Sequence, residues 1–214
     1  IVTNKTAKSH AISEFKIAMM NFDQELFFNT YDWLTKEKSF QEIFYDVFLP
    51  LMNEMGMLWQ TDTITPSHEH FITFLIKQKL LIQTEQLQIR KPTKTDKVFV
   101  LSLPMNEIHE LGLMYLNYEI LAKGYKTIYL GESVPIDSLK YLKNHFESIV
   151  FVSYLTVQPD KDNVNEYITE MKQVLESDTT SLWFIGRMVA HIDPAIVDEK
   201  MQVFQSIEAL VSSI

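Results

Sequence analysis

Apolar side chains in the first part of the chain recur every three or four positions, the spacing that places them on one face of an α-helix. The longest series consists of Ile43, Val47, Leu51, Met55 and Leu58. Two shorter series precede it, namely Ile12, Phe15 and Met19, and then Leu26, Phe27, Thr30 and Leu34. The pattern therefore predicts three amphipathic helices in this part of the chain.

A fourth helix is expected after the polar segment that follows Trp59. Thr65 suits the position that caps a helix, and Pro66 suits the first helical residue because proline has no N–H group to leave unpaired. The side chains expected to face the core are Phe71, Phe74, Leu75, Gln78 and Ile82. Four helices with short connections predict an N-terminal four-helix bundle over residues 1–92.

The pattern changes after the polar segment 90–97, which we interpret as a linker. Runs rich in β-branched and aromatic residues, typical of strands, cover 97–103, 126–131, 148–155 and 181–186. Helical spacing covers 108–124, 135–146, 164–176 and a last segment that includes 205–212. This alternation predicts an α/β fold over residues 96–214, with a doubly wound parallel sheet that is Rossmann-like and flavodoxin-like.

The composition limits which partners the chain can bind directly and which cell compartment it suits. The net charge of −9 argues against DNA or an anionic membrane as a direct partner of this chain. No apolar run approaches the roughly 20 residues of a membrane span, and the N-terminus lacks the apolar core of a signal peptide. Cysteine is absent, which excludes disulfides and thiolate metal sites and favours a cytoplasmic location. Because the first residue is Ile1 and not Met, we expect a piece of a longer protein.

Unusual residues follow three of the expected strands, at the edge of a parallel sheet where ligands bind. They are Glu107, His109 and Gly112 after the first strand, Ser153 and Leu155 at the end of the third, and Gly186 at the end of the fourth. A carboxylate two residues before a histidine can hold one imidazole nitrogen, which leaves the other free to ligate a metal. Alternatively, Glu107 and His109 are ordinary polar residues at a helix N-terminus.

A second group of residues lies in the expected bundle. Trp59 ends the third helix, and after nine intervening residues Glu69 and His70 open the fourth. A pocket between two helices could use this arrangement. Alternatively, Trp59 is a core residue at a helix end and His70 is simply exposed. We interpret the other histidines near the cap and in the second half, His68, His145 and His191, as surface residues.

The order Glu-x-His-x-x-Gly, Ser-x-Leu and then Gly at a strand end resembles the cobalamin-binding module of methionine synthase and its relatives. The resemblance implies that His109 ligates cobalt from below, in place of the cofactor's own base. It also implies that Ser153 joins the Glu107–His109 network. Small residues line a slot for the nucleotide tail in that family, which adds Gly112, Leu155 and Gly186 to the candidate cofactor-binding residues.

The spacing from Trp59 to Glu69 and His70 resembles the cap signature of the CarH/LitR type of MerR-family photoreceptor regulators. In that family the bundle covers the upper face of adenosylcobalamin. The resemblance implies that Trp59 and Glu69 enclose the adenosyl group and that His70 takes the upper cobalt position once light has removed it. It further implies a regulator, not an enzyme, which self-associates as a dimer or tetramer. DNA would be bound through an N-terminal domain absent from this chain.

Arg187 departs from the resemblance, because the family usually has a second Gly after Gly186. A long cation there either obstructs the slot or points outward, where it could pair with a cofactor phosphate. We therefore keep Arg187 among the candidate cofactor-binding residues. Two other functions stay open: a corrinoid carrier protein of a methyltransferase, and a cofactor-free regulator of the same fold.

Overall fold

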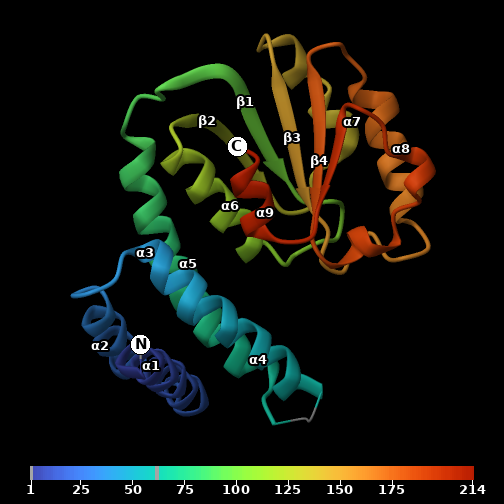
Figure 1. The fold of residues 1–214 in the computed structure, drawn as a ribbon. Coiled ribbons are helices and arrows are strands. Elements are labelled where there is room, and N and C mark those ends of the chain that lie inside the picture. Colours follow the sequence, from blue (N-terminus) through green and yellow to red (C-terminus); the bar gives the residue numbers. More distant parts are fainter. Residues whose placement is uncertain (1, 61–62) are drawn as a thin grey trace. The chain divides into compact units, whose positions relative to one another are not determined.

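The computed structural model describes residues 2–60 and 63–214, apart from the side chains of residues 2–6, 59, 60 and 144. The chain forms two compact units, Ile1–Gln83 and Thr84–Ile214. Helices make up the first unit, and a sheet flanked by helices makes up the second (Figure 1). Within the described ranges, no helix has both the length and the apolar character needed to cross a membrane.

The first unit contains the helices that the periodicity predicted. Their bounds are α1 Val2–Asn21, α2 Gln24–Leu34, α3 Phe40–Ile43, the π-helix η1 Phe44–Phe48, α4 Leu49–Gln60 and α5 Pro66–Gln88. The segment from α3 to α4 is continuous, so the third expected helix begins earlier than its apolar series. A capping box starts it: the Glu42 N–H donates to Ser39 Oγ at 3.3 Å, and the Ser39 N–H donates to Glu42 Oε2 at 2.8 Å.

Aromatic side chains form the core of this unit. Phe15 of α1 is fully buried, and its ring centroid lies 5.0 Å from that of Phe27 and 5.5 Å from that of Phe48. Phe44 is also fully buried, with its ring edge-on to Phe48. Because buried aromatic rings remove large areas from water, these contacts hold α1, α2 and the α3–α4 segment together.

Helix α5 begins at Pro66, directly after Thr65, as predicted. Its fully buried apolar side chains are Ile72, Leu75, Ile76 and Leu80. Phe74 and Ile82 are 58% and 49% exposed, so the predicted stripe is wrong at these two positions. Apolar residues occur nearly all round this helix, and two overlapping stripes therefore fit its sequence equally well.

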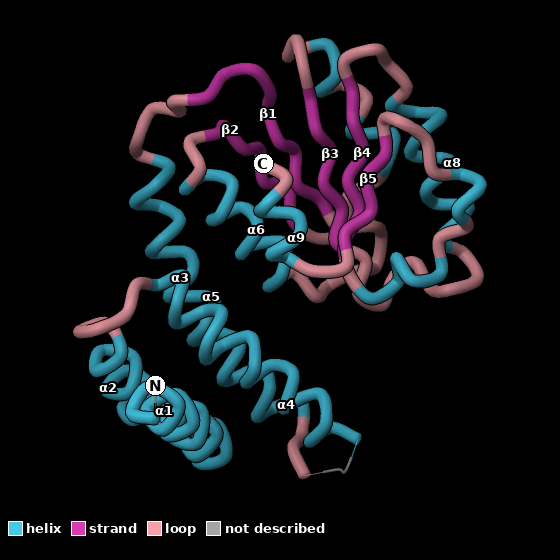
Figure 2. Tube along the Cα trace, viewed as in Figure 1, coloured by secondary structure: helices cyan, strands magenta, loops and turns pink. Residues whose placement is uncertain are grey.

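The second unit is a parallel sheet of five strands in the order β2-β1-β3-β4-β5, which is the flavodoxin-like order. The strands are β1 Lys94–Ser102, β2 Tyr125–Gly131, β3 Ile149–Tyr154, β4 Thr180–Ile185 and β5 Met201–Phe204. Figure 2 shows them side by side, with helices on both faces. The predicted doubly wound α/β fold is therefore confirmed.

Two helices cover each face of the sheet. Helix α6 (Leu111–Ala122) packs on β1 and β2 and contacts α9 (Ile207–Ser212) (Figure 1). Helices α7 (Ile136–Leu139) and α8 (Val164–Leu175) contact each other. Their buried apolar side chains form one cluster with strand residues on the face of the sheet opposite to α6 and α9. Three short 3-10 segments complete the unit: η2 Leu142–Asn144, η3 Arg187–His191 and η4 Pro194–Ile196.

Three details differ from the sequence-based predictions. Strand β5 was not predicted, because it has four residues and buries only Met201 and Phe204. The segment interpreted as a linker contributes the exposed first residues of β1, which begins at Lys94. The helix expected over 135–146 is instead α7 followed by η2. Its core-facing residues, Ile136, Leu139 and Leu142, are three apart, a spacing that suits 3-10 turns better than an α-helix.

Candidate functional site

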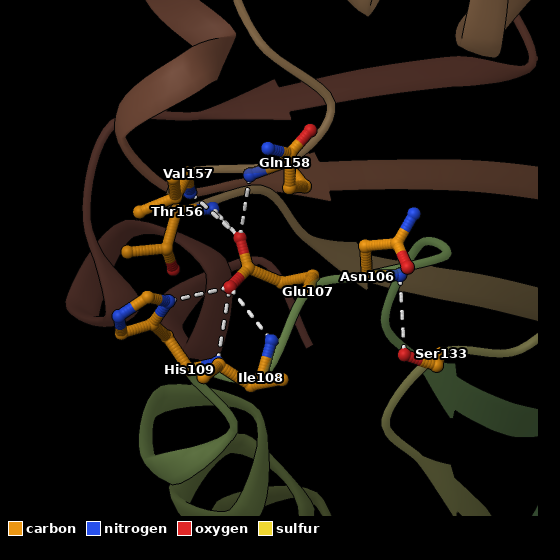
Figure 3. Close-up of polar contacts among 8 residues, drawn as sticks. All are labelled: Asn106, Glu107, Ile108, His109, Ser133, Thr156, Val157 and Gln158. Atoms are coloured by element: carbon orange, nitrogen blue, oxygen red, sulfur yellow. Dashed lines mark hydrogen bonds and ion pairs between the residues drawn. The ribbon is translucent and has the colours of Figure 1, made fainter.

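A fully buried carboxylate, that of Glu107, lies at the carboxyl edge of the sheet in the loop between β1 and α6. Its Oε2 accepts hydrogen bonds from three consecutive backbone N–H groups of the loop after β3: Thr156 at 3.2 Å, Val157 at 2.6 Å and Gln158 at 2.8 Å. Figure 3 shows this fan of contacts. One side chain thus ties together loops that follow two neighbouring strands.

The second oxygen of Glu107 organises its own loop. Oε1 accepts from the backbone N–H groups of Ile108 and His109, each at 3.0 Å. It also lies 2.6 Å from Nδ1 of the His109 imidazole. These bonds hold residues 108–110 outside the helix, so α6 starts at Leu111 and not at residue 108 as predicted.

Hydrogen bonds keep Glu107 ionised despite its burial. Burial by itself would raise the pKa of this carboxyl group. The N–H groups of Gln158, Val157 and His109, together with the His109 imidazole, outweigh burial and lower the pKa below its ordinary value. A negative charge is therefore fixed behind the imidazole at neutral pH.

The His109 ring is arranged to donate a nitrogen lone pair. An ionised carboxylate can only accept, so the hydrogen bond to Glu107 places the proton on Nδ1 and leaves the lone pair on Nε2. The side chain is 47% exposed, whereas that of Glu107 is 1% exposed. The contact expected between the two residues is thus present, and it has the form that tunes a metal-ligating histidine.

Ser153 is fully buried on β3, and its hydroxyl lies 3.2 Å from the phenol oxygen of Tyr167 in α8. The hydrogen bond described for Ser153 thus runs to the α8 face, whereas the resemblance implied a bond within the Glu107–His109 network. Burial raises the pKa of the Tyr167 phenol to about 12, so this hydroxyl pair is neutral.

Two glycines permit close contacts, each within the protein. Gly186 has a φ of +116°, and a Cβ atom there would lie 2.4 Å from the carbonyl oxygen of Leu155. A Cβ atom at Gly112 would lie 2.7 Å from ring carbons of Tyr154. Gly186 therefore has to be glycine, because its φ is positive and the atoms in the way are backbone, whereas a side chain at Gly112 would require the Tyr154 ring to move.

Arg187 is the first residue of η3 and is exposed. Its guanidinium therefore carries no burial cost, as expected for an unpaired cation. The departure from a Gly-Gly sequence adds a charge at the surface.

The remaining candidate residues belong to the helical unit. Trp59 lies near the end of α4, and its side chain is outside the described residues. Glu69 is half-buried in the first turn of α5, and His70 is exposed next to it. His68 has a structural role, because its Nδ1 accepts the Thr65 N–H at 3.1 Å and its ring stacks on Phe22. It thus takes the place of the acid in a capping box.

Four exposed apolar residues near the carboxyl edge of the sheet were missed in the sequence. Four large apolar side chains near the carboxyl ends of β1, β2 and β3 are 40–62% exposed: Met105, Ile108, Leu130 and Val157. Met105 and Ile108 lie close to Glu107 in the sequence. Apolar residues in a loop at the end of a strand could have indicated this surface, but our prediction was based only on the polar residues there. Exposed apolar residues at the carboxyl edge of a parallel sheet are available to a small-molecule ligand, because ligands bind at this edge.

Comparisons with known proteins support cobalamin binding in general terms. Residues 11–82 match the family model described as the B12 binding domain, and this region lies in the helical unit. The HTH-type transcriptional repressor CarH of Myxococcus xanthus is 27% identical over 96 residues, which cover 45% of this chain and 31% of that protein. The matched stretch therefore spans about a third of the length of this curated relative.

The fold is also that of a corrinoid protein. The structure of the monomethylamine corrinoid protein of Methanosarcina barkeri matches 97% of this chain and 94% of its own, with a TM-score of 0.71 and 13% sequence identity. At that identity the likeness concerns the fold alone. The B12 binding domain match supports cobalamin binding, and the chain is similar both to a CarH repressor and, in fold, to a corrinoid protein.

Proposed function

We propose that this chain is the light-sensing effector part of a MerR-type transcriptional regulator and that it binds adenosylcobalamin through His109. The observation that carries the proposal is the buried Glu107 carboxylate, which holds Nδ1 of His109 at 2.6 Å and leaves Nε2 available. The CarH match and the Trp59, Glu69 and His70 spacing favour the regulatory form of such a site.

The residues present fit the cofactor. Nε2 of His109 is the kind of donor that ligates cobalt, and the Glu107 carboxylate fixes the orientation of the ring. Met105, Ile108, Leu130 and Val157 offer apolar surface to a large macrocycle. When bound, adenosylcobalamin would supply a cobalt–carbon bond that light can break.

Each candidate residue then has a defined task. His109 would ligate cobalt through Nε2, and Glu107 fixes the orientation of its ring. By the resemblance of their spacing, Trp59 and Glu69 would contact the adenosyl group, and the exposed His70 would supply a second nitrogen donor after photolysis. The change of cobalt ligand would alter self-association as a dimer or tetramer. It would thereby alter DNA binding by a domain outside this chain. The protein would act in the cytoplasm.

A corrinoid carrier of a methyltransferase is the second candidate, favoured by the whole-chain likeness in fold to a corrinoid protein. Such a carrier would bind cobalt through the same Glu107–His109 pair, but His70 would not act as a cobalt ligand. A cofactor-free regulator is the third, favoured by Tyr154, whose ring lies against Gly112.

One experiment separates these functions. The protein is incubated with adenosylcobalamin in the dark, and visible spectra are recorded before and after green light, alongside His109→Ala and His70→Ala. We expect His109→Ala to weaken binding or to leave the cofactor's own base on cobalt. We expect His70→Ala to bind normally in the dark and to lose the light product held by two histidines.

Other outcomes select the alternatives. Stable binding with the same spectral behaviour in wild type and His70→Ala would favour a carrier. The absence of bound corrinoid in the wild type would favour the cofactor-free regulator. A His109→Ala variant with wild-type affinity and spectrum would refute the assigned ligand.

A further inference from the structure

The loop that carries His109 is fastened on two sides, and only one of them involves Glu107. On the side of β2, the Tyr129 hydroxyl donates to Oε2 of Glu110 at 3.0 Å. On the same side, the Asn106 N–H donates to Ser133 Oγ at 3.1 Å, a contact visible in Figure 3. The loop is thus tied to β2 as well as to the segment after β3.

Glu110 is at the N-cap position of α6, where an acidic side chain commonly accepts hydrogen bonds from the first N–H groups of the helix. Its carboxylate makes no such capping hydrogen bond to that helix. It reaches instead to Tyr129, a residue of edge strand β2 that pairs with Leu101 of β1. The residue directly after His109 is therefore anchored to the sheet through a side chain.

Tyr129 is suited to act as a permanent donor. Burial raises the pKa of its phenol, and the charge of Glu110 together with the hydrogen bond raises it further, as does the charge of Glu132. The hydroxyl therefore stays protonated throughout the pH range in which proteins are handled. The Tyr129 hydroxyl therefore remains a hydrogen-bond donor to the Glu110 carboxylate at every such pH.

We propose that Tyr129 and Glu110 are positioning residues for His109, acting with Glu107 to fix the direction of Nε2. Glu107 holds the ring and the backbone N–H of His109 on one side, and the Glu110–Tyr129 bond holds the next residue on the other. Loss of the Tyr129 contact removes the side-chain restraint on residue 110, while the backbone bonds of Glu110 to the Ile108 carbonyl and the Met114 N–H stay in place. The imidazole of His109 is then held from the Glu107 side alone and has a wider range of orientations. The link to cobalt ligation rests on the proposed function, whereas the positioning of the imidazole does not.

The chain offers a matched control for this role. Tyr129→Phe removes only the hydroxyl that binds Glu110. Tyr125→Phe makes the same change on the same strand, at its opposite end. Glu110→Gln retains a carbonyl oxygen that can accept from Tyr129, whereas Glu110→Ala does not.

The first measurement needs no cofactor. In the wild type, the Nδ1 proton of His109 is hydrogen-bonded to Glu107, so we expect a downfield proton resonance whose exchange with water can be followed by NMR. With one neutral-to-charged hydrogen bond lost, we expect Tyr129→Phe and Glu110→Ala to exchange this proton roughly fivefold to tenfold faster. Tyr125→Phe and Glu110→Gln should stay close to the wild type.

The second measurement uses adenosylcobalamin in the dark. We expect Tyr129→Phe and Glu110→Ala to lower the share of bound cofactor that carries the histidine-ligated spectrum, and Glu110→Gln to restore it. If Tyr129→Phe behaves as Tyr125→Phe does in proton exchange, the positioning role is overturned. If the wild type binds no corrinoid, the proposed function fails, while the exchange data still decide the positioning role.

Discussion

Replacement of Glu107 by Gln tests the central contact of the sheet unit. The substitution keeps the size of the side chain but turns one of its two acceptor oxygens into an NH₂ donor. In either orientation, the NH₂ group faces donors that were bound by an oxygen. These are the N–H groups of residues 156–158 on one side, or those of Ile108, His109 and the imidazole on the other.

The expected cost follows from these contacts. A buried donor left without its acceptor costs about 1–3 kcal/mol, and hydrogen bonds to a charged group are stronger than neutral ones. Some N–H groups in these surface loops regain water, which limits the sum. We therefore expect Glu107→Gln to lower the free energy of unfolding by about 3–5 kcal/mol, a large part of the roughly 5–15 kcal/mol typical of a domain.

The assay is urea unfolding followed by circular dichroism at neutral pH, with Glu170→Gln as the control. Glu170 is an exposed residue of α8, so its substitution should change the stability by less than about 0.5 kcal/mol. A cost below about 1 kcal/mol for Glu107→Gln would refute the view that this carboxylate ties the two loops together.

The pH dependence of stability provides an independent test of the ionisation state of Glu107. The pKa of Glu107 is lowered in the folded protein from an ordinary value of 4.5, so its contribution to stability is present above pH 4.5. That contribution is lost as the pH falls through the lower folded pKa. The stability difference between wild type and Glu107→Gln should therefore be full at neutral pH and shrink steadily below pH 4.5. A difference that stays constant down to the acid transition would contradict the assigned ionisation.

Three further predictions concern packing and caps. Gly186→Ala should destabilise the protein by at least about 2 kcal/mol in urea unfolding, because of its positive φ and the contact with the Leu155 carbonyl; Gly56→Ala, with open space around the new Cβ, is the matched control and should be neutral or stabilising. Phe15→Ala should cost about 3–5 kcal/mol, since the ring is fully buried among other aromatic rings, and a cost below about 1 kcal/mol would contradict that core. Ser39→Ala should cost about 1 kcal/mol by removing a cap, and helical circular dichroism during thermal melting measures it.

Much of the fold follows from the sequence because its signals are local. Periodicity located the helices of the bundle, and Thr65-Pro66 located the start of α5. The face of α5 could not be predicted, because Phe74 and Leu75 belong to two stripes of similar apolar character and only the neighbouring helices decide between them. Strand β5 was missed because its burial depends on pairing with β4, a contact between distant residues.

The candidate site shows the same division. The contact between Glu107 and His109 could be predicted because two residues separated by one position can meet within a single turn of loop. The three N–H groups that bind the other Glu107 oxygen could not, since they lie about fifty residues away and backbone donors carry no residue type. That part of the site becomes visible only once β1 and β3 are neighbours.

The difference at Ser153 could have been inferred from the alternation of side chains along a strand. Adjacent residues of a β-strand point to opposite faces. Tyr154 lies against Gly112 of α6, so Ser153 must face the other layer, where Tyr167 of α8 lies. The loop residues 156–158 that bind Glu107 come after β3 has ended, where this alternation no longer applies. A family motif therefore specifies which residues are present, while the strand geometry of this chain decides which of them reach the histidine.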